Sequence, residues 1–166
     1  MTRTPRSRSA PTTRGLLALV AALVGAGGAG GCTVDTELGL AAEVTDAALI
    51  VDPGTDRYTA RVSVAFRVGE NARGVREFVP LRVDAEAGGT IATASSFARP
   101  PGFSGTLSPG DARTVTFTGE CLGGCNAAAL CAAGGTVPID FFWEDRGVTP
   151  PELGQTTGTA TVACTP

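Results

Sequence analysis

The five cysteines are the residues of this chain whose spacing is most informative about chemistry. Cys32 stands alone, whereas Cys121, Cys125, Cys131 and Cys164 fall in the last third of the sequence. The spacing of these four lacks the C-x2-C knuckle of a structural zinc site. It also lacks the C-x-x-C of a thioredoxin-like redox pair. The four cysteines are therefore predicted to form structural disulfides, and neither a metal site nor a cofactor is expected.

An even set of four cysteines suits an oxidising compartment. Four cysteines allow three connectivities, and the sequence does not choose among them. We favour Cys121–Cys164 with Cys125–Cys131. If the strand before Cys121 and the strand after Cys131 are antiparallel neighbours, the return strand ending at Cys164 reaches the same end of the fold. The first bridge would then hold the last strand, and the second would hold a short helix.

The segment ahead of Cys32 has the organisation of a secretory signal. It begins with a cationic stretch that contains no acidic residue and continues into an unbroken apolar run, 16–24. Small residues follow, in the order Ala29-Gly30-Gly31-Cys32. The apolar run is shorter than the roughly 20 residues that cross a bilayer. Residues 1–31 are therefore predicted to be a signal peptide that is removed.

The segment Ala29-Gly30-Gly31-Cys32 resembles the lipobox of bacterial lipoproteins, in which small residues precede a cysteine that is lipidated. The resemblance implies that Cys32 is the lipidated N-terminus of the mature chain and that membrane lipid is a partner. It places the protein in the cell envelope, anchored on the periplasmic or cell-surface side of a bacterial membrane. Ordinary signal cleavage would cut the same bond and leave Cys32 as a free thiol.

Composition removes several classes of function. The chain has no histidine, which excludes Ser-His and Cys-His dyads and the commonest zinc ligand. Loss of residues 1–31 takes away four of the 13 basic residues and none of the 16 acidic ones, leaving a formal charge of −7. That charge opposes binding to nucleic acid. Gly25, Gly27 and Gly30 satisfy G-x-G-x-x-G, but no strand and helix flank them, so no dinucleotide cofactor is predicted.

The loop around Phe97, Arg99 and Phe103 is the candidate partner-binding segment. Aromatic residues and arginine are enriched at binding hot spots, and two prolines stiffen the loop. Alternatively, both phenylalanines cover an open end of the core. The carboxylate pairs Asp52/Asp56 and Glu144/Asp145 could serve acid–base chemistry or hold calcium. Asp52 and Asp56 are interpreted instead as residues that flank a turn, and Glu144 and Asp145 as a strand end followed by a turn.

Alternating apolar and polar residues predict the strands that would position these groups. The clearest are 46–52 and 57–68, joined by a Pro-Gly turn as a hairpin, and 137–144, with Val137, Ile139, Phe141 and Trp143 facing inward. Further strands are expected at 77–85, 90–95, 113–118 and 157–164. Residues 36–48 fit either a helix or strands, and 126–131 fit a short helix capped by Asn126 and ended by Gly134.

The phrase Leu107-Ser108-Pro109-Gly110-Asp111, followed by Thr114-Val115-Thr116-Phe117, resembles the strand lead-in of bacterial immunoglobulin-like domains. With this resemblance, the expected fold is all-β: an antiparallel immunoglobulin-like β-sandwich of about seven strands with one short helix in a cysteine-rich loop. The domains would be the signal peptide 1–31, a lipidated tether or first strand 32–45, and the β-sandwich 46–166.

The function expected from these observations is that of a non-catalytic envelope lipoprotein. It would present a β-sandwich binding or structural module at a membrane surface, with an envelope protein or a polysaccharide as its partner. An exported carboxylate-based hydrolase or a calcium-binding accessory protein is the alternative. Inward-facing carboxylates with perturbed pKa values would favour the alternative, and an exposed apolar patch near Phe97 and Phe103 would favour the binding module.

Overall fold

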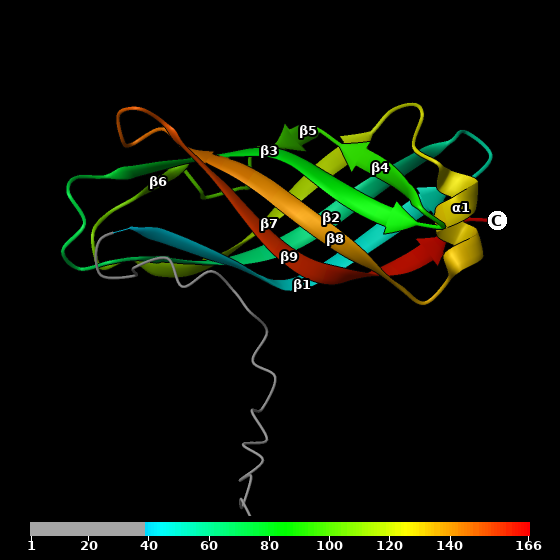
Figure 1. Ribbon diagram of the computed structural model, residues 1–166, viewed down its shortest axis with the longest axis horizontal. Coiled ribbons are helices and arrows are strands. Elements are labelled where there is room, and N and C mark those ends of the chain that lie inside the picture. The colour runs from blue at the N-terminus through cyan, green and yellow to red at the C-terminus, as the bar shows by residue number, and fades with distance from the viewer. Residues whose placement is uncertain (1–38) are drawn as a thin grey trace, which may run out of the picture. The chain divides into compact units, whose positions relative to one another are not determined.

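A computed structural model describes residues 39–166 of the chain, and Figure 1 labels its elements. In chain order these are β1 (Leu40–Asp52), β2 (Arg57–Val68), β3 (Arg76–Ala87), β4 (Thr90–Ala94), β5 (Ser96–Ala98), β6 (Thr106–Leu107), β7 (Ala112–Cys121), α1 (Ala127–Ala133), β8 (Thr136–Asp145) and β9 (Glu152–Cys164). The all-β prediction with one short helix is confirmed. Residues 40–48, which fitted either a helix or strands, belong to β1.

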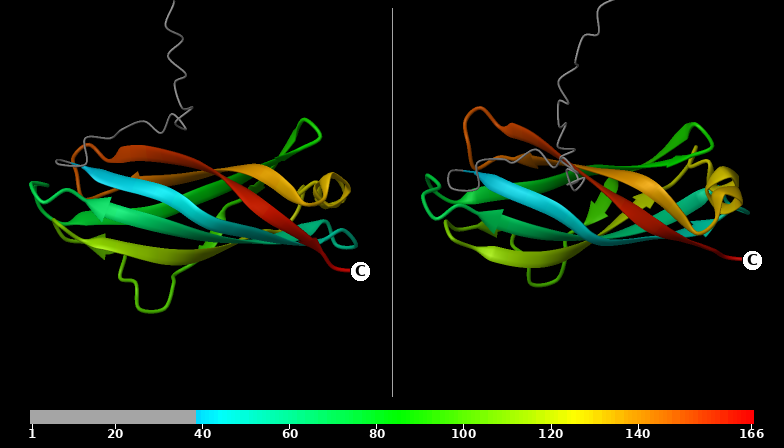
Figure 2. Two further views of the ribbon diagram at one scale, coloured as in Figure 1. Left: turned by 90° about the horizontal axis from the view of Figure 1, so that it is seen from below. Right: turned by 60° about the horizontal axis from the view of Figure 1, so that its bottom comes forward.

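The strands form one curled sheet in the order β4-β3-β8-β9-β1-β2-β7-β5, and β6 pairs with β3. β4 and β5 lie at the two ends of this order, yet only Ser95 separates them in the chain. The segment 90–98 therefore brings the two edges of the sheet together, so that the sheet curls around its core (Figures 1 and 2).

The predicted hairpin of β1 and β2 and the antiparallel pairing of β8 with β9 are both present. The strands before Cys121 and after Cys131, whose pairing was the condition for the favoured disulfides, are not neighbours, because β7 pairs with β2 and β5 whereas β8 pairs with β3 and β9. One contact is parallel: residues 48–51 of β1 pair with residues 161–164 of β9 (Figure 2). This contact joins the strands into one continuous sheet, and the two separate sheets of an immunoglobulin-like sandwich are not confirmed.

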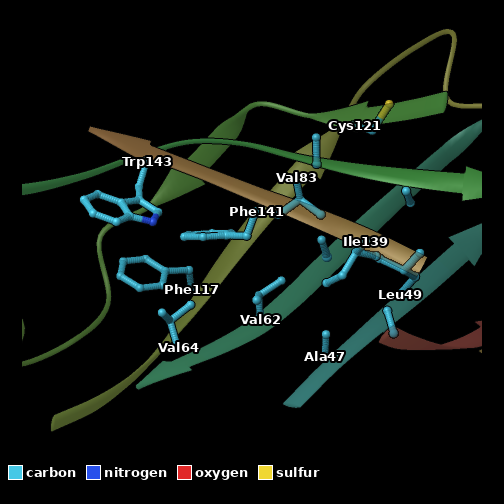
Figure 3. Packing of buried hydrophobic residues seen from close by; sticks show 14 of the residues in the cluster. Ala47, Leu49, Val62, Val64, Val83, Phe117, Cys121, Ile139, Phe141 and Trp143 are labelled. Carbon is cyan, nitrogen blue, oxygen red and sulfur yellow. The ribbon is translucent and has the colours of Figure 1, made fainter. Parts of the chain in front are cut away.

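The core lies inside the curl and is rich in aromatic rings (Figure 3). The four residues of β8 predicted to face inward are all buried. Phe117 of β7 lies 5.8 Å from Phe141 of β8, measured between ring centroids, and Phe78 of β3 lies 5.4 Å from Trp143. Strict alternation would place Phe78 and Val83 on opposite faces. An irregularity between Pro80 and Arg82 buries both.

Phe142 departs from the inward pattern because it lies on the outer face of β8. The guanidinium carbon of Arg82, on the neighbouring strand β3, lies 4.0 Å from the centroid of its ring. Arg82 also donates from Nε to Asp84 at 3.0 Å. The ring is therefore covered by a cation that is itself fixed by a carboxylate, which explains an aromatic residue at a polar position.

All four cysteines of the last third are bridged, as predicted, but the preferred pairing is wrong. The bridges are Cys121–Cys125 and Cys131–Cys164. The physical reason is the sheet order. Cys164 ends β9 beside Val51 of β1 rather than beside β7, and α1 carries Cys131 to that place. The first bridge closes the short loop after β7, and the second ties the end of the described chain to α1.

The predicted helix 126–131 corresponds to α1, with Gly134 at its C-cap. Asn126 occupies the N-cap position, but its side chain makes no capping hydrogen bond. Asp56, in the turn between β1 and β2, supplies the cap instead. Its two carboxylate oxygens accept from the backbone N–H groups of Cys125 at 3.2 Å and Ala127 at 2.9 Å. The turn of the first hairpin thus fixes the position of α1.

Candidate functional site

The predicted partner-binding residues meet at a pocket of about 300 Å³, which we name the β3–β5 pocket. Its walls are residues 77–80 of β3, residues 95 and 97–100 in and around β5, residues 103–105 of the following loop, and Phe117 of β7. Phe97, Arg99 and Phe103 all line it. The volume is at the lower end of the range for small-molecule pockets.

The pocket exists because one edge of β3 is only partly paired. β6 pairs with this strand at Arg76 and Glu77, and β4 pairs with it from Val83 onward. Between them, the N–H of Phe78 donates to the carbonyl of Gly105 at 2.8 Å. Pro80, two residues further along the same edge, has no N–H to leave unpaired. The loop after β5 therefore covers a gap in the sheet, and the pocket is the space that remains.

Phe103 reaches from that loop into the core. It is only 5 % exposed, and its ring lies 6.2 Å from that of Phe66 and 5.9 Å from that of Phe117. Gly105 permits this path because it has φ +91°, a backbone conformation that residues with a side chain rarely adopt. Of the two interpretations of Phe103, the structure supports the one in which it covers the core. Phe103 is still among the residues that line the pocket.

Phe97 is half-buried and lies across β7. A side chain at Gly119, which is paired with Phe97, would lie 2.5 Å from its ring, so the ring rests directly on this glycine. On its inner side the ring lies 6.0 Å from Phe141, edge to face. Phe97 is thus held between the core and the pocket. An exposed apolar patch does not form there, because the rings of Phe97 and Phe103 are turned inward around a small cavity.

The charges at the pocket are unevenly distributed. Arg99 is exposed, and it forms no ion pair with any residue that the structure describes. Glu77 is the one acidic residue among those that line the pocket. Arg113 does not line the pocket, but its guanidinium carbon lies 5.9 Å from the centroid of Phe103. Arg99 is therefore a cation with no ion-pair partner in residues 39–166, at a pocket whose lining residues include four phenylalanines, in an acidic protein.

Sequence reasoning missed the contributions of Phe78, Phe117 and Gly119 to this site, since they come from strands far away in the chain. Gly119 carried a signal, because a glycine inside a strand often marks a close approach of another group. The site is thus formed by one loop that was predicted as a binding segment and by residues of two strands, β3 and β7, that were not.

A second hollow, of about 180 Å³, is lined by three carboxylates, Asp84, Glu86 and Asp140. Asp84 accepts from Thr93 Oγ1 at 2.7 Å and from Arg82 Nε at 3.0 Å, so both of its oxygens are engaged. Within residues 39–166, no group of three or more His, Cys, Asp or Glu side chains is arranged to hold a metal ion.

The carboxylate pairs singled out from the sequence have separate roles. Asp52 accepts from the N–H of Gly54 and from the hydroxyl of Thr55, and these bonds, led by that from Thr55, lower the pKa of its carboxyl group. Asp145, in contrast, is 1 % exposed and pairs with the buried Arg76 at 3.1 Å. Asp145 was predicted at a strand end before a turn, and it is the last residue of β8; the burial of its side chain was not predicted.

Cys32, the predicted lipidation site, lies outside the described residues, as do residues 1–31. From residue 39 to the end of the chain, the structure holds no helix with the length and apolar character required to span a bilayer.

No protein-family model matches the chain, and no curated protein matches it either. A solved structure that matches is YcdA of Bacillus subtilis, described as a candidate lipoprotein, with 11 % identity and a TM-score of 0.37. The match covers 74 % of this chain but only 37 % of that chain. At this TM-score the similarity assigns neither a fold nor a function.

Proposed function

We propose that this protein is an exported, lipid-anchored and non-catalytic envelope protein whose β domain is a binding module. The anchor is Cys32, and the ligand site is the β3–β5 pocket. The observation that carries the binding role is that Phe97, Arg99 and Phe103 line the same cavity. The anchor rests on the sequence, which combines a cationic start, an apolar run and small residues directly before a cysteine.

Two disulfides support an oxidising location outside the cytoplasm. Catalysis is disfavoured by the residues present, because the chain lacks histidine and the inward-facing Asp145 is held in an ion pair with Arg76. A lipid on Cys32 would keep the β domain close to the membrane, where it could take up a small ligand or an envelope component.

Intact-mass measurement of membrane-extracted protein tests the anchor. We expect a chain that begins at Cys32, carries acyl groups and retains both disulfides. The Cys32→Ser variant is the matched control and should lose both the added mass and the membrane association. A soluble protein that retains Met1 and has reduced cysteines would overturn the anchor and the export together.

A neutral aromatic dye, N-phenyl-1-naphthylamine, tests the pocket. We expect one dye to bind per protein, with fluorescence enhancement. The Phe97→Asp variant, which places a charge in the cavity, should weaken binding about tenfold or more. Ile91→Asp is the matched control, because Ile91 is an apolar residue that is 61 % exposed and lies outside the pocket wall. Equal binding by the two variants would show that the dye does not use this pocket.

A further inference from the structure

We infer that the β3–β5 pocket binds a small monoanion with a flat apolar body, such as an aromatic carboxylate or sulfonate, and that Arg99 receives its charge. This inference rests on the proposed function, which assigns the pocket as a ligand site but leaves open what it binds. It is argued from the size, the walls and the charge of the pocket.

The size and the wall chemistry select a flat apolar body. A cavity of about 300 Å³ accepts a small molecule and lacks the area of a stable protein interface, which takes roughly 800 Å² from each partner. Four phenylalanines, Phe78, Phe97, Phe103 and Phe117, are among the residues that line it, and Phe97 is the least buried of them. Aromatic rings associate through offset-stacked and edge-to-face contacts, so a planar ligand gains contacts that a branched aliphatic one does not.

The charge selects an anion. The mature chain has a formal charge of −7, with nine basic and 16 acidic residues, so most of its surface repels anions. Arg99 stands at the pocket without an ion-pair partner among the described residues. Its planar guanidinium can bind a carboxylate or sulfonate through two parallel hydrogen bonds. Glu77 also lines the pocket, and its negative charge disfavours a second negative charge on the ligand, which points to a monoanion.

The backbone of the pocket wall disfavours an extended peptide as the occupant. Addition of a strand needs free N–H and C=O groups along a sheet edge. On this edge of β3, the N–H of Phe78 is already bonded to Gly105, and Pro80 has none to offer. This stretch of β3 therefore offers a peptide few free backbone N–H groups. A small molecule needs only the phenylalanines of the pocket and the guanidinium of Arg99.

The test compares two dyes that share an N-phenylnaphthylamine framework. 1-Anilinonaphthalene-8-sulfonate is an anion, and N-phenyl-1-naphthylamine is neutral. Both are titrated into the folded, disulfide-bonded protein, and the emission of Trp143 is followed as a second signal. Trp143 is the sole tryptophan, and its ring centroid lies 5.4 Å from that of Phe78, a residue that lines the pocket. We expect the anion to bind more tightly than the neutral dye, with one site per protein.

Two variants and one control identify the groups responsible. Arg99→Gln should weaken the anionic dye about tenfold and leave the neutral dye within about twofold. Gly119→Ala pushes the ring of Phe97 aside and should change the affinity for both dyes alike. Arg61→Gln, at an exposed position of β2 away from the pocket wall, should change neither.

The outcomes separate this inference from the function on which it rests. Binding of both dyes with equal affinity, unchanged by Arg99→Gln, would overturn the anion specificity and leave the pocket as an apolar site. Failure of both dyes to bind, or binding unaffected by Gly119→Ala, would overturn the pocket itself. Competition by an extended peptide and not by benzoate or naphthoate would overturn the assignment to a small molecule.

Discussion

The buried ion pair between Asp145 and Arg76 supplies the sharpest test of what holds this fold together. Asp145 is the last residue of β8, and its carboxylate accepts three hydrogen bonds. They come from Arg76 Nη1 at 3.1 Å, from the N–H of Glu77 at 3.2 Å and from the N–H of Gly147 at 2.9 Å. One side chain thus joins the end of β8, the start of β3 and the loop that leads to β9.

The Asp145→Asn substitution changes the charge and nearly preserves the shape. The asparagine oxygen can still accept from the two backbone N–H groups, but its NH₂ would face the guanidinium of Arg76, donor against donor. Arg76 is 5 % exposed, so its charge stays buried without the carboxylate. Breaking a buried pair in this way costs about 3–5 kcal/mol of unfolding free energy. In a domain of this size the melting temperature should fall by roughly 10–25 °C.

Urea unfolding followed by Trp143 fluorescence, with the disulfides intact, measures this loss. The control is the neighbouring exposed pair Arg146–Glu144, at 2.6 Å with the arginine side chain 52 % exposed. Glu144→Gln should lower stability by about 1 kcal/mol or less. Adding Arg76→Met to Asp145→Asn should recover at least about 1 kcal/mol, because the buried guanidinium that has lost the Asp145 carboxylate is then removed. If Asp145→Asn costs no more than Glu144→Gln, the buried pair does not hold these elements together.

Three further predictions concern other parts of the fold. Gly154→Ala places a methyl group against the Trp143 ring and should lower stability by about 1–3 kcal/mol, with a shift in tryptophan emission. Asp56→Ala removes the cap of α1 and should cost about 1–2 kcal/mol in urea unfolding, with Asp56→Asn costing less. Burial raises the pKa of Tyr58, so the stability from its neutral form is present below about pH 10 and lost as pH rises further. Tyrosinate absorbance at 295 nm should therefore appear with unfolding, and not earlier.

The sequence predicted local structure well because alternation encodes the face of each strand. The inward residues of β8 follow from that period, and the hairpin of β1 and β2 follows from the period together with the Pro-Gly turn between the strands. The same period extends to Asp145, two residues beyond Trp143, so its burial could have been predicted. The pairing with Arg76 could not have been predicted, because nothing in the local sequence around a charged residue at the start of a strand indicates which strand will lie beside it.

The partners of strands that no hairpin turn joins, and the pairing of the cysteines, could not be predicted from the sequence for a related reason. Periodicity says which face of a strand is buried but not which strand lies beside it, and the parallel contact of β1 with β9 has no local signature. That contact decides where Cys164 ends and hence that it bridges to Cys131. For the pocket, the loop with Phe97, Arg99 and Phe103 was predicted from composition. The walls from β3 and β7 depend on the sheet order and could not be.

The buried pair and the pocket are connected through one residue. The N–H of Glu77 is bonded to Asp145, while its side chain lines the β3–β5 pocket beside Phe78. The residues of β3 directly after Glu77 have no neighbouring strand on the pocket side, because the pairing with β6 stops at Glu77 and the pairing with β4 begins only at Val83. Their position therefore depends on β8 and on the Asp145 carboxylate. A gap in a sheet can serve as a binding site only if the strands around it are fixed. Here the hydrogen bond from Glu77 to the buried Asp145 carboxylate helps to fix β3 next to the stretch where no strand pairs with its pocket side.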